Sequence, residues 1–224
     1  MIATPELIEA LAANAAPVRR LRPPLVRAAL WLAFALLIVG LLGLSHGARP
    51  DLAERMRHAT FVLGLAGSVL TGTLAAVAAF FLSLPDRSRS WILLPVPTLV
   101  LWLSVTGYGC LTNWVAIGPE GVRLAETARC FATLVLASAP LWLAALVMLR
   151  HAALVRPRLV ASLAGLAVGG LSATALTLFH DLSATAMVLV WNIGIAAFAV
   201  GAGGVLGRRM FSWVAPPPAI AARG

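Results

Sequence analysis

Charged residues are scarce in this sequence, and lysine is absent from it. Only 11% of the 224 residues are charged, whereas 61% are hydrophobic, and the mean hydropathy is +0.95. No water-soluble fold of this length needs so apolar a composition, so we expect lipid to be the solvent. The segments between the long apolar runs are short, which leaves no room for a soluble catalytic domain.

Six apolar runs are each long enough to cross a bilayer, whose hydrocarbon core of about 30 Å takes about 20 helical residues. They are residues 25–44, 60–84, 91–112, 128–149, 159–179 and 185–206. The fold class is therefore predicted as all-α, a polytopic membrane protein with six transmembrane helices. We divide the chain into a cytoplasmic N-terminal segment (1–24), the transmembrane domain (25–206) and a short proline-rich cytoplasmic tail (207–224).

All 17 basic residues are arginines, and their positions predict the orientation of the chain. In the six-span topology, twelve arginines fall on the side of the two termini and five fall on the other side. Because loops rich in basic residues stay in the cytoplasm, we expect both termini to be cytoplasmic and the protein to lie in the inner membrane. The basic face then lies against the anionic lipid bilayer. Arginines at helix ends do not predict direct contact with nucleic acid.

The central parts of the second to sixth runs contain no aspartate, glutamate, arginine or lysine. Proton-coupled transporters and ion pumps usually need such residues at depth, so their absence argues against transport and against acid–base catalysis within the membrane. The sequence also has no phosphate-binding loop, no paired carboxylates, and no HExxH or GxSxG motif. We therefore expect neither an enzyme nor a cofactor.

Small residues recur every four positions in the second, fifth and sixth runs. They are Gly64, Ser68, Gly72 and Ala76, then Ala161, Gly165, Gly169 and Ala173, then Ala197 and Gly201. Such stripes let helix backbones approach closely in lipid. We expect them to pack within one bundle, and a homodimer face is the alternative. Pro95 and Pro97 in the third run and Pro140 in the fourth predict kinks.

The chain has two cysteines, and the topology brings both to the outer side. Cys110 lies near the end of the third run, Cys130 begins the fourth, and His180 and Asp181 follow the fifth. Thiols close to an imidazole and a carboxylate in an oxidising compartment are able to form a disulfide or bind a soft metal ion. Alternatively, the cysteines are small buried apolar residues, while His180 and Asp181 cap a helix end. The two cysteines do not form a CxxC motif, so their spacing does not decide between these alternatives.

Residues 4–16 are predicted to form a short amphipathic helix, with Thr4 as N-cap, Pro5 at the first helical position and two early glutamates. At about 100° per residue, one face is apolar and small: Leu7, Ile8, Leu11, Ala12 and Ala15. A helix of about a dozen residues is marginal alone, so it folds against lipid, against the cytoplasmic loops, or against a soluble protein with a groove. The polar face lacks the basic residues typical of membrane-surface helices, which favours a protein partner.

Short motifs follow one another along almost the whole chain. In order, they are Glu6-Leu7-Ile8-x-x-Leu11-Ala12, Pro17-Val18-x-x-Leu21, Arg27-Ala28-x-x-Trp31-Leu32, Arg49-Pro50-Asp51-Leu52, Ser83-x-Pro85-x-Arg87-Ser88, Gly109-Cys110-Leu111 with Trp114, Cys130-Phe131, Arg156-Pro157-Arg158-Leu159 and Trp191. Their order and spacing, over roughly residues 4–213, resemble the NrsF family of bacterial membrane anti-sigma factors.

The resemblance implies a six-span protein that holds an extracytoplasmic-function sigma factor inactive through its cytoplasmic N-terminus. It further implies release of the sigma factor on an envelope, oxidative or metal stress signal. By this analogy Leu7, Ile8 and Leu11 contact the sigma factor, with Ala15 on the same helix face, and the region of Cys130 takes part in sensing.

One departure from the family concerns the sensing residues. The family commonly shows His-Cys at the outer end of the fifth span and Trp-His in the sixth, where this chain has His180-Asp181 and Trp191-Asn192. Sensing in this chain then uses Cys110 as the second thiol, or responds to a different signal. The alternative function class is a small-molecule permease or lipid-handling membrane protein in which the N-terminal helix is only a membrane-edge element.

Overall fold

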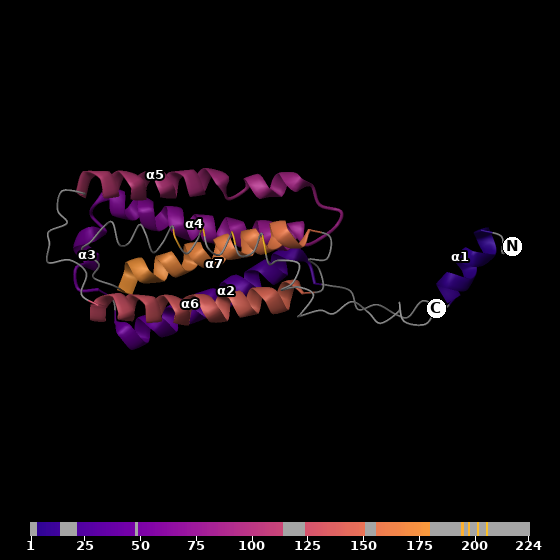
Figure 1. The fold of residues 1–224 in the computed structure, drawn as a ribbon, viewed down its shortest axis with the longest axis horizontal. Coiled ribbons are helices and arrows are strands. Elements are labelled where there is room, and N and C mark those ends of the chain that lie inside the picture. Colours follow the sequence, from indigo (N-terminus) through magenta and orange to yellow (C-terminus); the bar gives the residue numbers. More distant parts are fainter. Residues whose placement is uncertain are drawn as a thin grey trace.

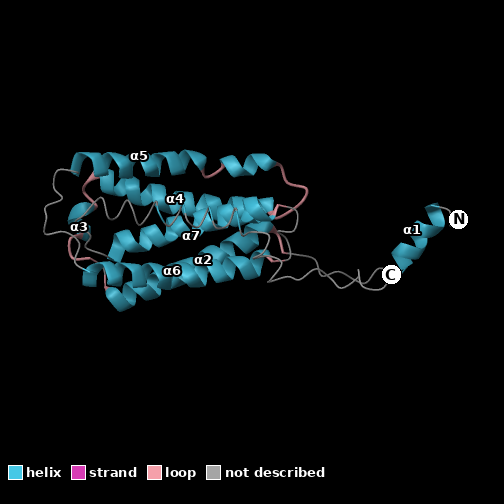
Figure 2. Ribbon diagram, viewed as in Figure 1, coloured by secondary structure: helices cyan, strands magenta, loops and turns pink. Residues whose placement is uncertain are grey.

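The computed structural model describes residues 4–13, 22–47, 49–113, 124–150 and 156–179, and the single residues Gly194, Ala197, Gly201 and Val205. Within these residues the chain is helical, with short turns and no strand (Figure 2). The helices, in chain order, are α1 (Thr4–Ala13), α2 (Pro24–His46), α3 (Leu52–Arg55), α4 (Ala59–Leu82), the 3₁₀ helix η1 (Arg89–Leu93), α5 (Val96–Asn113), α6 (Leu124–Leu149) and α7 (Pro157–Phe179). The predicted all-α class is confirmed.

The five long helices lie side by side along one axis (Figure 1). Helix α7 is the centre of this bundle, because α2, α4 and α6 all pack on it and its side chains from Val160 to Leu176 are nearly all buried. Helix α5 packs on the far side of α4. Helix α3 lies at one end of the bundle, and α1 lies beyond the other end (Figure 1).

Four segments of the described residues are long and apolar enough to cross a membrane: Pro24–Ser45, Ala59–Leu82, Arg89–Tyr108 and Pro157–Phe179. They coincide with the first, second, third and fifth predicted runs. The fourth predicted run lies within α6, whose apolar stretch Val135–Leu149 is shorter. The sixth predicted run, 185–206, lies outside the described residues except for four single positions.

The third predicted run is two helices instead of one, because η1 ends at Leu93 and α5 begins at Val96. A proline has no N–H to donate, so Pro95 cannot continue the hydrogen-bond ladder of η1, and the helix is interrupted there although Leu94 keeps helical backbone angles. The carbonyl of Pro95 then accepts hydrogen bonds from the Leu99 N–H (2.9 Å) and from the Thr98 hydroxyl (3.0 Å). Helix α6, in contrast, continues through its internal proline, Pro140.

Helices α4 and α7 approach each other closely at two glycines. A Cβ atom on Gly170 would lie only 2.9 Å from the backbone nitrogen of Gly72 and from the carbonyl oxygen of Ser68. One turn away, the hydroxyls of Ser68 and Thr174 are 3.0 Å apart. The predicted stripe of the second run therefore packs within the bundle. In the fifth run the close approach to α4 is at Gly170, which is not a member of the predicted stripe.

Candidate functional site

One end of the bundle carries most of the described arginines, and we call it the arginine end. Here α2 and α7 begin, α4 and α6 end, and the turn between α4 and η1 lies. Its seven arginines are Arg22, Arg27, Arg87, Arg89, Arg150, Arg156 and Arg158. The opposite end, beside α3, has four among the described residues, namely Arg49, Arg55, Arg57 and Arg129 near the start of α6. Helix α1 lies beyond the arginine end (Figure 1).

Arg27 belongs to the first turn of α2 but is only 6% exposed. Its Nη2 donates a hydrogen bond to the carbonyl oxygen of Met148, and its guanidinium lies over the ring of Phe80, 5.2 Å from the centroid. Met148 is in the last turn of α6, where carbonyls have no partner within the helix and carry a partial negative charge. Arg27 is therefore a cap for the C-terminus of α6.

Trp31, one turn further along α2, makes a second bond to the same helix. Its Nε1 donates to the carbonyl of Leu141 at 3.1 Å, and its side chain is fully buried. Residues four apart lie on one helix face, so Arg27 and Trp31 together fix that face of α2 against α6. The position at which the N-terminal segment joins the bundle is set by these two contacts.

The turn that follows α4 is exposed from Pro85 to Ser90, yet several contacts hold its shape. The guanidinium of Arg87 lies over the ring of Phe81 (5.5 Å), and Phe81 stacks on Trp91 with ring centroids 4.1 Å apart and an interplanar angle of 17°. The Ser88 hydroxyl caps η1 by accepting a bond from the Ser90 N–H (3.2 Å). The turn is thus an ordered surface at the arginine end.

Arg156 joins the start of α7 to this turn, because its Nη1 donates to the carbonyl of Arg87 at 3.0 Å. Arg27, Trp31, Arg87 and Arg156 all belong to the motifs quoted above, although the sequence assigned them no individual contacts. Motif membership was therefore the signal that they matter, and the bundle supplies the reason: each fixes one element at the arginine end to another.

The arginine end is strongly electropositive. Apart from α1, Asp86 is the one acidic residue that the described part of the chain places there, and its Oδ2 lies 3.7 Å from Nε of Arg87. Neither α2 nor α7 has an acidic residue in its first turn, and each helix N-terminus adds a partial positive charge. The arginine end should therefore attract anionic groups.

At the opposite end, Arg49 and Arg55 enclose the carboxylate of Asp51. Nε of Arg49 lies 2.5 Å from Oδ1, and Nε of Arg55 bonds to Oδ2. The hydrogen bond from Arg49 and, to a lesser extent, that from Arg55 hold the pKa of Asp51 well below its usual range. The backbone N–H of Arg49 also donates to the carbonyl of Leu178 (3.3 Å), which ties this loop to the end of α7.

Leu7, Ile8 and Leu11, the predicted partner contacts, lie in α1, whereas Ala15 is outside the described residues.

Of the predicted sensing residues, Cys110 is in the last turns of α5 and Cys130 is in the second turn of α6. Figure 1 shows α5 and α6 on opposite sides of the bundle. His180 and Asp181 lie outside the described residues, so the predicted cluster stays a prediction. Among the residues that are described, no group of three His, Cys, Asp or Glu side chains is suited to hold a metal ion.

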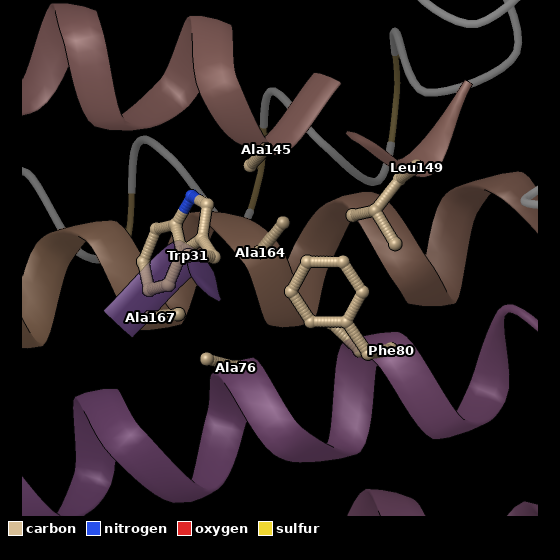
Figure 3. Close-up of a pocket in the computed structure, with 8 residues that line it drawn as sticks. Trp31, Ala76, Phe80, Ala145, Leu149, Ala164 and Ala167 are labelled. Carbon is tan, nitrogen blue, oxygen red and sulfur yellow. The ribbon is translucent and has the colours of Figure 1, made fainter. Parts of the chain in front are cut away.

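A small apolar pocket lies inside the bundle where α2, α4, α6 and α7 meet. It is lined by Trp31, Ala76, Ala79, Phe80, Ala145, Leu149, Ala164 and Ala167 (Figure 3). None of these side chains is titratable, and most are alanines, so the pocket is a packing space beside the Arg27 contact and offers no ligand chemistry.

The fold and the arginine end define a helical protein with several apolar helices of membrane-spanning length and one basic end. A family model described as NrsF, negative regulator of sigma F, matches residues 11–213. The chain belongs to this family, as the sequence motifs predicted. No curated protein and no solved structure matches it. The matched residues begin at Leu11, so Leu7 and Ile8 precede them.

Proposed function

We propose that this chain is an inner-membrane anti-sigma factor with six transmembrane helices and both termini in the cytoplasm. Its α1 helix binds an extracytoplasmic-function sigma factor and keeps it from RNA polymerase. An envelope, oxidative or metal stress signal releases the sigma factor. Membership of a family of negative regulators of a sigma factor supports the regulatory role.

The observation that carries this proposal is the position of α1. It is a separate helix beyond the arginine end, and its described side chains at Thr4, Pro5, Glu6, Glu9 and Ala13 are exposed. The arginine end is cytoplasmic by the positive-inside rule. A helix at this position meets soluble cytoplasmic proteins and is held at the membrane by the rest of the chain.

The binding energy comes from the apolar stripe of α1. Full burial of one leucine or isoleucine side chain contributes about 1.5–3 kcal/mol, and helix-in-groove recognition reads such side chains at i, i+3 and i+4 spacing. Leu7, Ile8 and Leu11 have this spacing. A charge introduced at two of these positions should therefore abolish binding.

The test is capture of sigma factors by the full-length protein in detergent. The native protein is compared with a Leu7→Asp/Leu11→Asp variant and with an Ala13→Ser control, because Ala13 is exposed and off the stripe. We expect the native protein and the control to retain a sigma factor that mass spectrometry identifies, and the double variant to lose it. Equal retention by all three proteins would contradict the role of α1.

The sensing part of the proposal concerns the end opposite the arginine end. Cys110, Cys130, His180 and Asp181 are the candidates, acting through a disulfide, a bound metal ion or a change in helix position. Serine at each cysteine in turn, followed by measurement of oxidant-induced release of the sigma factor, tests them. Release that survives both substitutions would remove the thiols from the mechanism.

A further inference from the structure

We propose that Glu6 and Glu9 dock α1 on the arginine end of its own bundle, so that the apolar stripe of α1 points away from the membrane. The docked helix would present Leu7, Ile8 and Leu11 to the cytoplasm as a preformed surface. The role of that surface in binding a sigma factor rests on the proposed function, but the contact between α1 and the bundle does not.

Charge complementarity identifies α1 as the occupant. Helix α1 contains two acidic residues and no basic residue, and both glutamates are exposed. At the arginine end, Arg89 and Arg158 are exposed and form no ion pair with any residue that the structure describes. The acidic helix and the basic end belong to the same chain and lie on the same side of the bundle (Figure 1).

The helical period of α1 places the docking glutamates and the apolar stripe on two different faces. Glu6 and Glu9 are three residues apart and therefore share one face. At about 100° per residue, both lie roughly 140–160° around the helix from Leu11. A contact made through the glutamates thus leaves the apolar stripe uncovered, and the helix is able to hold the bundle and a partner at once.

The connecting segment is long enough for this contact. Residues 14–23 join α1 to α2, and an extended chain of this length spans at most about 36 Å. Because α2 begins at the arginine end, α1 reaches the turn after α4 without passing along the bundle. The helix itself is about 15 Å long.

The receiving surface is already ordered. The stack of Arg87, Phe81 and Trp91 and the bond from Arg156 to the Arg87 carbonyl hold the turn that carries Arg89. A rigid surface loses little conformational entropy on binding. Because the contact is made by only two exposed carboxylates and several guanidinium groups, we expect it to be weak. Salt should screen it.

The experiment is a spin-label distance measurement on the full-length protein with no sigma factor present. Labels are attached through Ala13→Cys and Ser90→Cys, two exposed positions, with both native cysteines replaced by serine. Docking predicts a short-distance population that decreases as salt rises from 0.05 to 1 M, since the Debye length falls to about 3 Å at 1 M. Glu6→Gln/Glu9→Gln and Arg89→Ser/Arg158→Ser should each remove that population, whereas Arg57→Ser at the opposite end should keep it.

Three outcomes would overturn the inference. The first is a broad distance distribution that neither charge variant changes. The second is a short distance in neutral-lipid nanodiscs that is lost with anionic phosphatidylglycerol, because lipid headgroups would then occupy the arginines. The third is a short distance between singly labelled molecules, which would assign the contact to a second copy. Because no sigma factor is present, these outcomes leave the capture test of the proposed function unaffected.

Discussion

The guanidinium of Arg27 in the first turn of α2 donates to the carbonyl of Met148 in the last turn of α6, across the ring of Phe80. An arginine that the sequence pattern alone would place at the membrane surface therefore points into the bundle. There it binds a carbonyl that has no partner within its own helix. This contact fixes the point at which the α1 segment leaves the helical bundle.

Removing this cap should destabilise the bundle. Arg27→Met keeps most of the apolar stem and leaves the Met148 carbonyl without its side-chain donor, a loss of about 1–3 kcal/mol. Arg27→Lys should be intermediate, because lysine keeps the charge but not the planar stacking of guanidinium on Phe80. Thermal unfolding in detergent measures both changes. Melting of Arg27→Met at the native temperature would show that the cap contributes nothing.

Alanine at two glycines should have opposite effects. A Cβ on Gly170 meets backbone atoms of α4 at 2.9 Å, so α4 and α7 must separate, which costs about 1–3 kcal/mol as overpacking does. Gly107 in α5 has nothing within 4 Å of such a Cβ, so alanine there should be neutral or stabilise by about 0.5–1 kcal/mol. Unfolding temperatures of the two variants provide the comparison. A Gly170→Ala protein as stable as Gly107→Ala would contradict the close approach.

The bond of Asp51 to Arg49 and Arg55 should appear in the pH dependence of stability. The folded state depresses the pKa of Asp51, so its contribution is present above the unfolded pKa of about 3.9 and is lost as pH falls below it. Asp51→Asn should therefore lower the unfolding temperature at neutral pH, with a difference from the native protein that narrows in acid. Asp86→Asn, which removes a looser surface pair of 3.7 Å, is the control and should change little. A gap that stays constant down to pH 3 would argue against this ion pair.

Loss of the Arg156 side chain should loosen one turn and little else. Its bond to the Arg87 carbonyl is exposed, and exposed contacts of this kind contribute about 0–1 kcal/mol. Arg156→Ala should therefore speed amide hydrogen exchange between residues 84 and 90 and leave the unfolding temperature almost unchanged. Protection in α2 is the internal reference. Equal exchange in native and variant proteins would mean that the turn is ordered without Arg156.

The helices themselves could be predicted from the sequence because hydropathy and proline act locally. The first, second and fifth apolar runs match their helices to within about two residues, and the run that contains Pro95 is broken at that proline. The sequence could not predict which helix is central, since α5 and α7 are similarly apolar. Gly170 on α7 decides this, because it lies against Gly72 on α4, about a hundred positions earlier in the chain.

The candidate site was predictable in charge but not in contacts. The arginine count of the loops predicted a basic end, and the structure has one. The inward positions of Arg27 and Arg49 could not be predicted, because Arg27 contacts the carboxyl end of α6 at Met148 and the backbone of Arg49 contacts the end of α7 at Leu178. Such contacts depend on how helix ends meet in space, which the local pattern around each arginine does not encode.

Transcription in vitro, with the sigma factor identified by capture, tests whether the protein is an anti-sigma factor. RNA polymerase and that sigma factor are mixed with the full-length protein in nanodiscs, or with its Leu7→Asp/Leu11→Asp variant. We expect the native protein to suppress sigma-dependent transcription in proportion to its concentration, and the variant to leave transcription at the level of empty nanodiscs. Undiminished transcription with saturating native protein would contradict the anti-sigma function, and equal suppression by the variant would contradict the role of α1.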